Sequence, residues 1–188
     1  MSTSVLADTP VPILQHAFEF SKLLELYRER TPQRVLEIGT YHGGTLWHWL
    51  QNATATTRVV TVDSYMTGID NRGLFVKWSQ ETGVDLEIVE GDSNADTTAA
   101  RVRPFAPFDW IFIDAGHYLA EVTRDWELYS PMVADGGVIA LHDILPPSEH
   151  HPEIQVAGLW NALVQTERTA EIVEDQDADW GGIGVVYR

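Results

Sequence analysis

The chain has 188 residues, 44% of them hydrophobic and 21% charged, and no cysteine. This composition indicates one globular domain and excludes thiol catalysis, cysteine metal sites and disulfides. Its 28 acidic and 12 basic residues give a net charge of −16, which argues against nucleic acid or an anionic membrane as a partner, because phosphate-rich surfaces require basic patches. The sequence also lacks an apolar run of about 18 residues and a signal peptide before Pro12, so we expect a cytoplasmic protein without a membrane partner.

Helical spacing of apolar residues predicts an opening helix over residues 13–30, within an N-terminal helical segment of residues 1–31. Short apolar or β-branched runs then predict strands, in chain order, at residues 34–39, 58–62, 86–89, 108–113, 138–141, 169–173 and 184–187. The stretches between them predict helices at residues 43–50, 74–82, 96–102, 119–132 and 156–165. Asp135-Gly136-Gly137 is expected to stop the fourth of these helices.

Strands that alternate with helices predict a mostly parallel sheet covered on both faces, because parallel neighbours need long crossover connections. Only a turn-like segment separates the last two strands, so we expect an antiparallel hairpin at the C-terminus. The predicted fold is therefore α/β: a Rossmann-like, doubly wound sheet of about seven strands in a single domain over residues 1–188.

Ligands of open α/β sheets bind at the carboxyl ends of the strands. The polar residues and glycines that follow the predicted strands are Glu37, Gly39, Asp63, Asp92, Ser93, Asp114, His117, His142 and Asp143. The glycine-containing segment 37–44 matches neither the dinucleotide nor the P-loop pattern, which favours a nucleoside without a pyrophosphate. Gly39 and Gly43 would let the backbone approach this ligand, and Asp63 could accept the ribose hydroxyls, although glycines also serve plain turns.

Three segments, VLEIGTYHGGT from Val35, VTVD ending at Asp63 and EGDS ending at Ser93, resemble the first three motifs of class I S-adenosylmethionine-dependent methyltransferases. The resemblance covers about residues 34–145. It implies that S-adenosylmethionine contacts the following residues: Glu37, Gly39 and Tyr41 around the methionine part, with Gly43 and Asp114 nearby, Asp63 at the ribose, and Asp92 with Ser93 beside the adenine.

Two later segments, FIDAGHY from Phe112 and GGVIALHDI from Gly136, resemble small-molecule O-methyltransferases with a divalent metal site, of the catechol type or from antibiotic sugar pathways. The resemblance places the metal on Asp114, His142 and Asp143, and the catalytic base on His117, with Asp114 beside it. Magnesium is expected from the family. A histidine ligand departs from the catechol pattern and favours manganese, iron, zinc or nickel, so these ions stay open.

The chemistry requires such groups, because a hydroxyl must lose its proton as its oxygen attacks the methyl carbon, and a cation stabilises the oxygen's developing charge. Plainer roles also fit these residue types: aspartates cap loops and helices, and half-buried histidines are common without catalytic roles. The pair His150-His151 is more typical of a solvated loop than of a ligand. Trp180 or His42 is predicted to line the pocket.

The predicted function is methyl transfer from S-adenosylmethionine to the hydroxyl of a small molecule, a sugar or a phenol. Two alternatives stay open: a metal-dependent hydroxylase or hydrolase on the same scaffold, and a non-catalytic module that binds S-adenosylmethionine. The strong net acidity fits a solvated surface or a cationic substrate. No lid is evident, so closure is expected from the opening helix, from residues 64–73, from the His150 loop or from a second subunit in a homodimer.

Overall fold

The computed structural model describes residues 5–64 and 70–188, so residues 65–69 of the predicted closure loop lie outside the described residues. Seven strands form one sheet in the order β3-β2-β1-β4-β5-β7-β6. The strands are β1 (Arg34–Ile38), β2 (Arg58–Asp63), β3 (Asp85–Glu90), β4 (Phe108–Ile113), β5 (Val133–His142), β6 (Arg168–Ile172) and β7 (Ile183–Tyr187). The α-helices are α1 (Ala17–Arg30), α2 (Gly44–Asn52), α3 (Arg72–Thr82), α4 (Asp96–Val102), α5 (Leu119–Tyr129) and α6 (Val156–Thr166).

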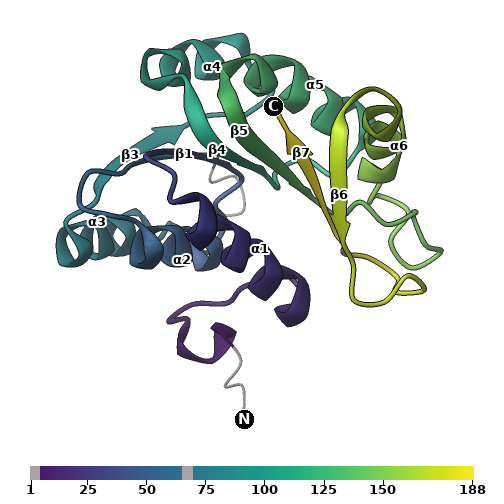
Figure 1. Cartoon of the computed structure of the whole chain (residues 1–188), viewed down its shortest axis with the longest axis horizontal. Helices are drawn as coiled ribbons and strands as arrows, with labels where there is room; N and C mark the ends of the chain where they lie inside the picture. The colour runs from purple at the N-terminus through teal and green to yellow at the C-terminus, as the bar shows by residue number, and fades with distance from the viewer. Residues whose placement is uncertain (1–4, 65–69) are drawn as a thin grey trace.

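The first five strands pair in parallel, whereas β7 runs antiparallel to both of its neighbours, β5 and β6. Helices cover both faces of this sheet, with α1, α2 and α3 on one side and α4, α5 and α6 on the other (Figure 1). The predicted α/β fold and its C-terminal antiparallel hairpin are confirmed. Within the described residues, no helix is both long and apolar enough to cross a membrane.

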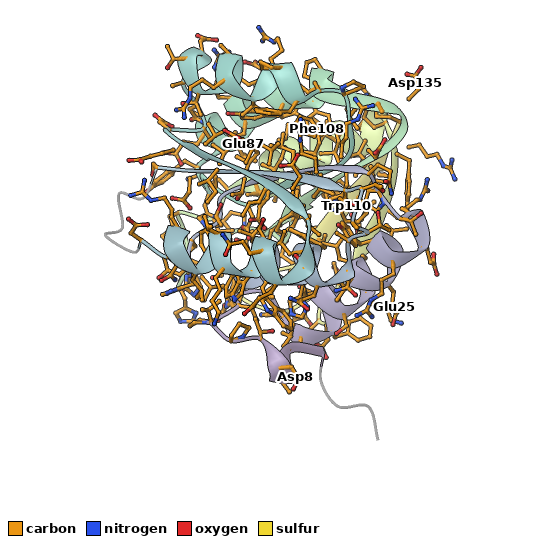
Figure 2. The ribbon with its side chains drawn as sticks, turned by 90° about the vertical axis from the view of Figure 1, so that its left-hand side faces the viewer. Asp8, Glu25, Glu87, Phe108, Trp110 and Asp135 are labelled. Carbon is orange, nitrogen blue, oxygen red and sulfur yellow. The ribbon has the colours of Figure 1, made fainter. Side chains whose placement is uncertain are left out.

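The alternation of side chains along β4 divides the core into two layers, because successive strand residues point to opposite faces. Ile111 and Ile113 pack with the residues under α4, α5 and α6, whereas Trp110 and Phe112 pack with those under α1, α2 and α3. Figure 2 shows Phe108 and Trp110 inside the molecule, while acidic side chains such as Asp135 point outward. Burial on both faces accounts for the continuous apolar runs of the central strands.

The strand order reverses between β1 and β4, because β2 and β3 are added on one side of β1 and the later strands are added on the other side. Crevices at such a reversal, outside the carboxyl ends of the strands, are the usual binding sites of open α/β sheets. The ends of β1, β2, β4 and β5 place the residues predicted from the sequence around this point.

Two predicted boundaries were wrong. The opening helix begins at Ala17 instead of residue 13, because His16 adopts an extended backbone with φ −60° and ψ 135°. The predicted helix stop at Asp135 to Gly137 lies inside β5, which begins at Val133. Here the last residue of the chain extends the sheet, since Gly136 N–H donates to the Arg188 carbonyl and Arg188 N–H donates to the Gly137 carbonyl.

Candidate active site

A cavity of about 850 Å³ opens at the carboxyl edge of the sheet. The predicted residues that line it are Gly39, Tyr41, Asp63, Asp92, Ser93, Asp114, His117, His142 and Asp143. Trp180 and His42, both predicted as pocket residues, also line it. The strand ends therefore place nine of the eleven predicted site residues around the cavity. The other two do not line it: Glu37 lies behind its wall, and Gly43 lies inside the turn after β1.

Asp63, at the end of β2, fixes the turn that follows β1. Its Oδ2 accepts hydrogen bonds from the backbone N–H groups of Thr40 at 2.9 Å and Tyr41 at 2.7 Å. Tyr41 has φ +48°, a left-handed conformation that side chains other than glycine rarely adopt. The aspartate thus holds the turn in a conformation that presents its edge to the cavity.

Gly39 is required at this turn by its neighbours. Its φ is +90°, and a Cβ here would lie 2.1 Å from the backbone oxygen of Asp114. The absence of a side chain therefore lets the turn after β1 approach the end of β4. Gly43 faces the protein interior instead, where a Cβ would lie 2.2 Å from Phe75, and it does not line the cavity.

Glu37 lies behind the cavity wall and is fully buried. Its Oε1 accepts hydrogen bonds from Thr45 Oγ1 at 2.5 Å and Trp49 Nε1 at 2.9 Å, and its Oε2 accepts one from Thr61 Oγ1 at 3.1 Å. Burial raises the pKa of Glu37 to about 8, although these three donors oppose the shift. The carboxyl group joins β1 to β2 and α2 beneath the turn.

The loop after β3 carries Asp92, Ser93 and Asn94 into the cavity lining. Asp92 Oδ1 accepts the backbone N–H of Asn94 at 3.0 Å. From α5, Asp125 Oδ1 accepts Asn94 Nδ2 at 2.7 Å, and Tyr129 donates its hydroxyl to the Ser93 carbonyl at 2.9 Å. Burial raises the pKa of Asp125 to about 6. This loop is thus anchored to a helix on the far side of the sheet.

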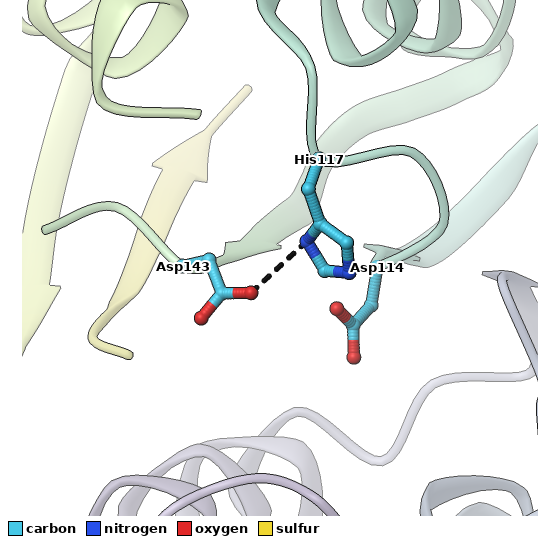
Figure 3. Close-up of side chains that lie close together, drawn as sticks. All are labelled: Asp114, His117 and Asp143. Atoms are coloured by element: carbon cyan, nitrogen blue, oxygen red, sulfur yellow. Dashed lines mark ion pairs between the residues drawn. The ribbon is translucent and has the colours of Figure 1, made fainter. Parts of the chain in front are cut away.

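Asp114, His117 and Asp143 come together from the ends of β4 and β5. One ligand atom from each lies within 4.8 Å of the other two, a grouping that could hold a metal ion. His117 Nδ1 lies 3.1 Å from Asp143 Oδ2, and Figure 3 shows the imidazole ring between the two carboxylates. Asp143 has φ +63°, so its backbone, like that of Tyr41, adopts a rare conformation at the site.

His142, predicted as a metal ligand, is buried beside the same carboxylates. Its Nδ1 lies 3.2 Å from Asp114 Oδ1 and 3.4 Å from Asp143 Oδ2. Its Nε2 is also buried and has no hydrogen-bond partner among the described residues. A ring nitrogen in this state, in a residue that lines the cavity, is suited to meet a bound group, because buried polar atoms normally have partners.

Burial and neighbouring charges shift the pKa values of His117, His142 and Asp143. The hydrogen bond to Asp143 raises the pKa of His117, against burial. Burial alone would lower the pKa of His142, but Asp114 and Asp143 raise it well above its usual value. Burial alone would raise the pKa of Asp143, but the facing His142 and His117 outweigh this effect and hold the pKa below its usual value. Perturbed groups of this kind in one cleft are typical of a functional site.

Segments far apart in the sequence cover the cavity. Residues 12–15, before α1, form one wall, and Gln15 Nε2 donates to Asp114 Oδ2 at 2.5 Å. Trp180, from the connection between β6 and β7, packs edge-on against His16 with ring centroids 4.3 Å apart. His151 lines the cavity, whereas His150 pairs with Asp179 at the surface. The lining residues near the opening helix thus precede α1, and none of the described lining residues belongs to α1 itself.

Gln15 and Asp125 were not predicted as site residues from the sequence. A single glutamine in a predicted helix gives no signal, and its role depends on the extended backbone before Ala17. Asp125 did have a signal, because it follows Val122 by three residues on the buried stripe of α5. A buried acid on an apolar helix face requires a partner, and here the partner is Asn94 in the cavity loop.

The cavity is strongly acidic. The described residues that line it include no lysine or arginine. They include six carboxylates: Asp63, Asp92, Asp114, Glu121, Asp143 and Glu153. Such a cavity attracts cations and neutral molecules and repels anions. Its position at the carboxyl ends of the strands, beside the glycine turn, is that of a ligand-binding site in a doubly wound α/β fold.

Sequence comparison identifies the family. A family model described as "Methyltransferase domain" matches residues 36–144, more than half of the 188-residue chain. The chain belongs to this methyltransferase family, which confirms the resemblance seen in its motifs. Among curated proteins, no sequence matches.

Solved structures of methyltransferases share the fold. An O-methyltransferase from Bacillus cereus in complex with S-adenosylhomocysteine has a TM-score of 0.71 at 18% identity, covering 97% of this chain and 84% of that chain. TomG from Streptomyces achromogenes, an O-methyltransferase of tomaymycin synthesis in complex with S-adenosylmethionine, has a TM-score of 0.66 at 18% identity over 93% and 81%. MycE of mycinamycin biosynthesis, in complex with magnesium and S-adenosylhomocysteine, has a TM-score of 0.60 at 20% identity over 93% and 50%.

Proposed function

We propose that this protein transfers a methyl group from S-adenosylmethionine to a hydroxyl of a small molecule, such as a sugar or a phenol, with His117 as the base and a divalent cation at the carboxylates. The observation that carries the proposal is the His117–Asp143 pair, 3.1 Å apart beside Asp114, in a cavity whose other end is built from the turn after β1. The O-methyltransferases that share the fold support the choice of a hydroxyl acceptor.

The cofactor would occupy the end of the cavity formed by β1, β2 and β3. Gly39 and Tyr41 would contact its methionine part, Asp63 its ribose, and Asp92 and Ser93 its adenine. S-adenosylmethionine carries a net positive charge through its sulfonium, and the acidic lining suits that charge. Glu37 and Gly43 would act from behind the wall, by holding the turn in place.

The reaction forms a bond between the acceptor oxygen and the methyl carbon, while the bond between that carbon and sulfur breaks. His117 would take the hydroxyl proton on Nε2, because Nδ1 faces Asp143, and Figure 3 shows the second ring nitrogen on the side of Asp114. Asp143 would fix the tautomer and stabilise the imidazolium that results. Proton removal then coincides with oxygen attack.

The donor set fits a divalent cation. Asp114 and Asp143 supply carboxylate oxygens within reach of one another, and His142, whose Nδ1 lies 3.2 Å from Asp114 Oδ1, would supply the third ligand. Such an ion would stabilise negative charge on the acceptor oxygen and orient it. Oxygen ligands suit magnesium, while the histidine admits manganese, iron, zinc or nickel.

The acceptor is expected to be neutral or cationic, since the cavity lining includes no described lysine or arginine that could hold a phosphate or carboxylate group.

The structure weakens the two arguments for a homodimer, which were the abundance of tryptophan and the lack of a cover for the cavity. Four of the seven tryptophans, Trp49, Trp78, Trp110 and Trp160, are buried in the monomer, and residues of the same chain cover the cavity. Light scattering at micromolar concentration tests the dimer, and a monomeric mass would remove it.

The function is tested by incubating the protein with S-adenosylmethionine, a pool of catechols and sugars, and magnesium or manganese, and by searching the products by mass spectrometry. A methylated acceptor that disappears in the His117→Gln variant supports the proposal. Cofactor binding without any product would favour the non-catalytic module. Failure to bind S-adenosylmethionine in calorimetry would overturn the proposal and favour a hydrolase or hydroxylase.

A further inference from the structure

Gln15 is the residue of the cavity whose state the proposed reaction leaves unexplained. It is 92% buried, since only 8% of its surface is exposed, and it lines the cavity. Its Nε2 donates to Asp114 Oδ2 at 2.5 Å, but its Oε1 is buried without a hydrogen-bond partner among the described residues. An unpaired buried carbonyl destabilises a folded protein, so its place in the cavity wall points to a bound partner.

The partner must be a cation or a hydrogen-bond donor, because a carbonyl oxygen has only lone pairs to offer. Asp114, which Gln15 contacts, belongs to the group with His117 and Asp143 that could hold a metal ion. Amide oxygens, like carboxylates, are ligands that hard divalent cations prefer. The unpaired oxygen therefore belongs to a side chain that already touches this group.

The two ends of the carboxamide can exchange places. The terminal torsion of a glutamine is broad and roughly two-fold, so a half-turn would bring Oε1 to the position that Nε2 occupies beside Asp114. Nε2 would then take the present place of Oε1 in the cavity wall, where its N–H groups can donate to a bound water or acceptor. Without a cation the N–H end faces the carboxylate, because two oxygens repel each other there. A positive ion next to Asp114 reverses this preference.

We propose that Gln15 is a further ligand of the cation at Asp114 and Asp143, supplied through its carboxamide oxygen from the segment before α1. The inference rests on the cation site of the proposed function. It also makes ion binding and pocket cover one event, because residues 12–15 form a wall of the cavity. This segment packs closely on α2, where a Cβ at Gly44 would lie 2.6 Å from the Pro12 carbonyl oxygen.

The test is the binding of Mn²⁺ alone to the metal-stripped protein, followed by electron paramagnetic resonance, with and without S-adenosylhomocysteine. We expect one site whose affinity falls about tenfold or more in Gln15→Ala, a loss in the range found for residues that support a metal site. Gln15→Glu keeps an oxygen at this position and should restore the affinity. Gln80→Ala, the same change at an exposed position of α3, should bind like the parent.

Each result decides the matter. Equal or tighter Mn²⁺ binding by Gln15→Ala would show that the amide only pairs with Asp114 or competes with the ion, and would overturn the inference. A loss in Gln15→Ala that Gln15→Glu does not restore would also overturn it. If the parent itself binds no Mn²⁺, the inference and the cation fall together, while calorimetry with S-adenosylmethionine, run in parallel in a chelator, still tests methyl transfer.

Discussion

The two ends of the cavity are built in different ways. The end proposed for the cofactor consists of the turns after β1, β2 and β3, and its bonds join neighbouring units, as when Asp63 holds the turn of Thr40 and Tyr41. The end proposed for the acceptor, around Asp114 and His117, combines segments far apart in the chain, and the contact between Gln15 and Asp114 spans 99 positions. A binding site for a common cofactor can thus be carried by local motifs, whereas the acceptor pocket depends on the complete fold.

The largest loss of turnover is expected from a substitution at the acceptor end. His117→Gln removes the proposed base, so we expect turnover to fall roughly 100- to 10,000-fold. Affinity for S-adenosylmethionine should stay close to that of the parent, because the other end of the cavity is untouched. Single-turnover kinetics and calorimetry measure the two effects, and an equal loss of both would break the division into two ends.

The buried acid beneath the cofactor end makes stability depend on pH. Burial raises the pKa of Glu37 from 4.5 to about 8, so the folded protein retains a proton that the unfolded chain releases. Its contribution is full below about pH 4.5 and is lost as the pH rises through 8, by on the order of 3–5 kcal/mol.

Glu37→Gln mimics the protonated acid and should remove this dependence. Its amide can keep the bonds of the acid, accepting from Thr45 and Trp49 and donating to Thr61. Compared with the parent, the variant should gain unfolding free energy as the pH rises from 5 to about 8 in urea titrations. Parallel curves for the two proteins would show that Glu37 is already ionised when folded.

The turn of the cofactor end should depend on one aspartate. Asp63→Ala leaves two backbone N–H groups unpaired and removes the expected ribose partner, so affinity for S-adenosylmethionine should fall roughly 10- to 100-fold. Calorimetry measures the loss, and Mn²⁺ binding should be retained. Unchanged cofactor affinity would place the nucleoside elsewhere in the cavity.

The smallest effect is expected at the anchor of the β3 loop. Asp125→Ala frees Asn94 from α5, and we expect affinity for S-adenosylmethionine to fall roughly two- to tenfold without a change in turnover at saturation. Asp125→Asn keeps an acceptor for Asn94 and serves as the matched control. A larger loss in the control than in Asp125→Ala would contradict the anchoring role.

The sequence predicted the sheet, its alternating helices and the strand-end residues because these follow from local patterns. Runs such as Phe108 to Ile113 are buried on both faces and indicate strands directly. Asp114 and Asp143 could be placed together, since parallel strands end at one edge of the sheet. Gln15 could not, because nothing local shows that the helix begins at Ala17 or that the preceding segment crosses the cavity.

Boundaries failed where tertiary contacts decide them. The residues around Gly136 are typical of a helix stop, but backbone hydrogen bonds to the distant Arg188 continue β5 through this segment. Similarly, the glycines of the first turn share a motif and differ in purpose: Gly39 allows close approach to the end of β4, whereas Gly43 makes room for Phe75. Only packing separates the two roles.

A crystal structure with S-adenosylhomocysteine and Mn²⁺, collected at a wavelength where manganese scatters anomalously, tests the central claim most directly. We expect the nucleoside along the turns after β1, β2 and β3, with its ribose at Asp63, and one anomalous peak bounded by Asp114, His142, Asp143 and the oxygen of Gln15. A nucleoside bound away from Asp63, or manganese bound away from these carboxylates, would contradict the account.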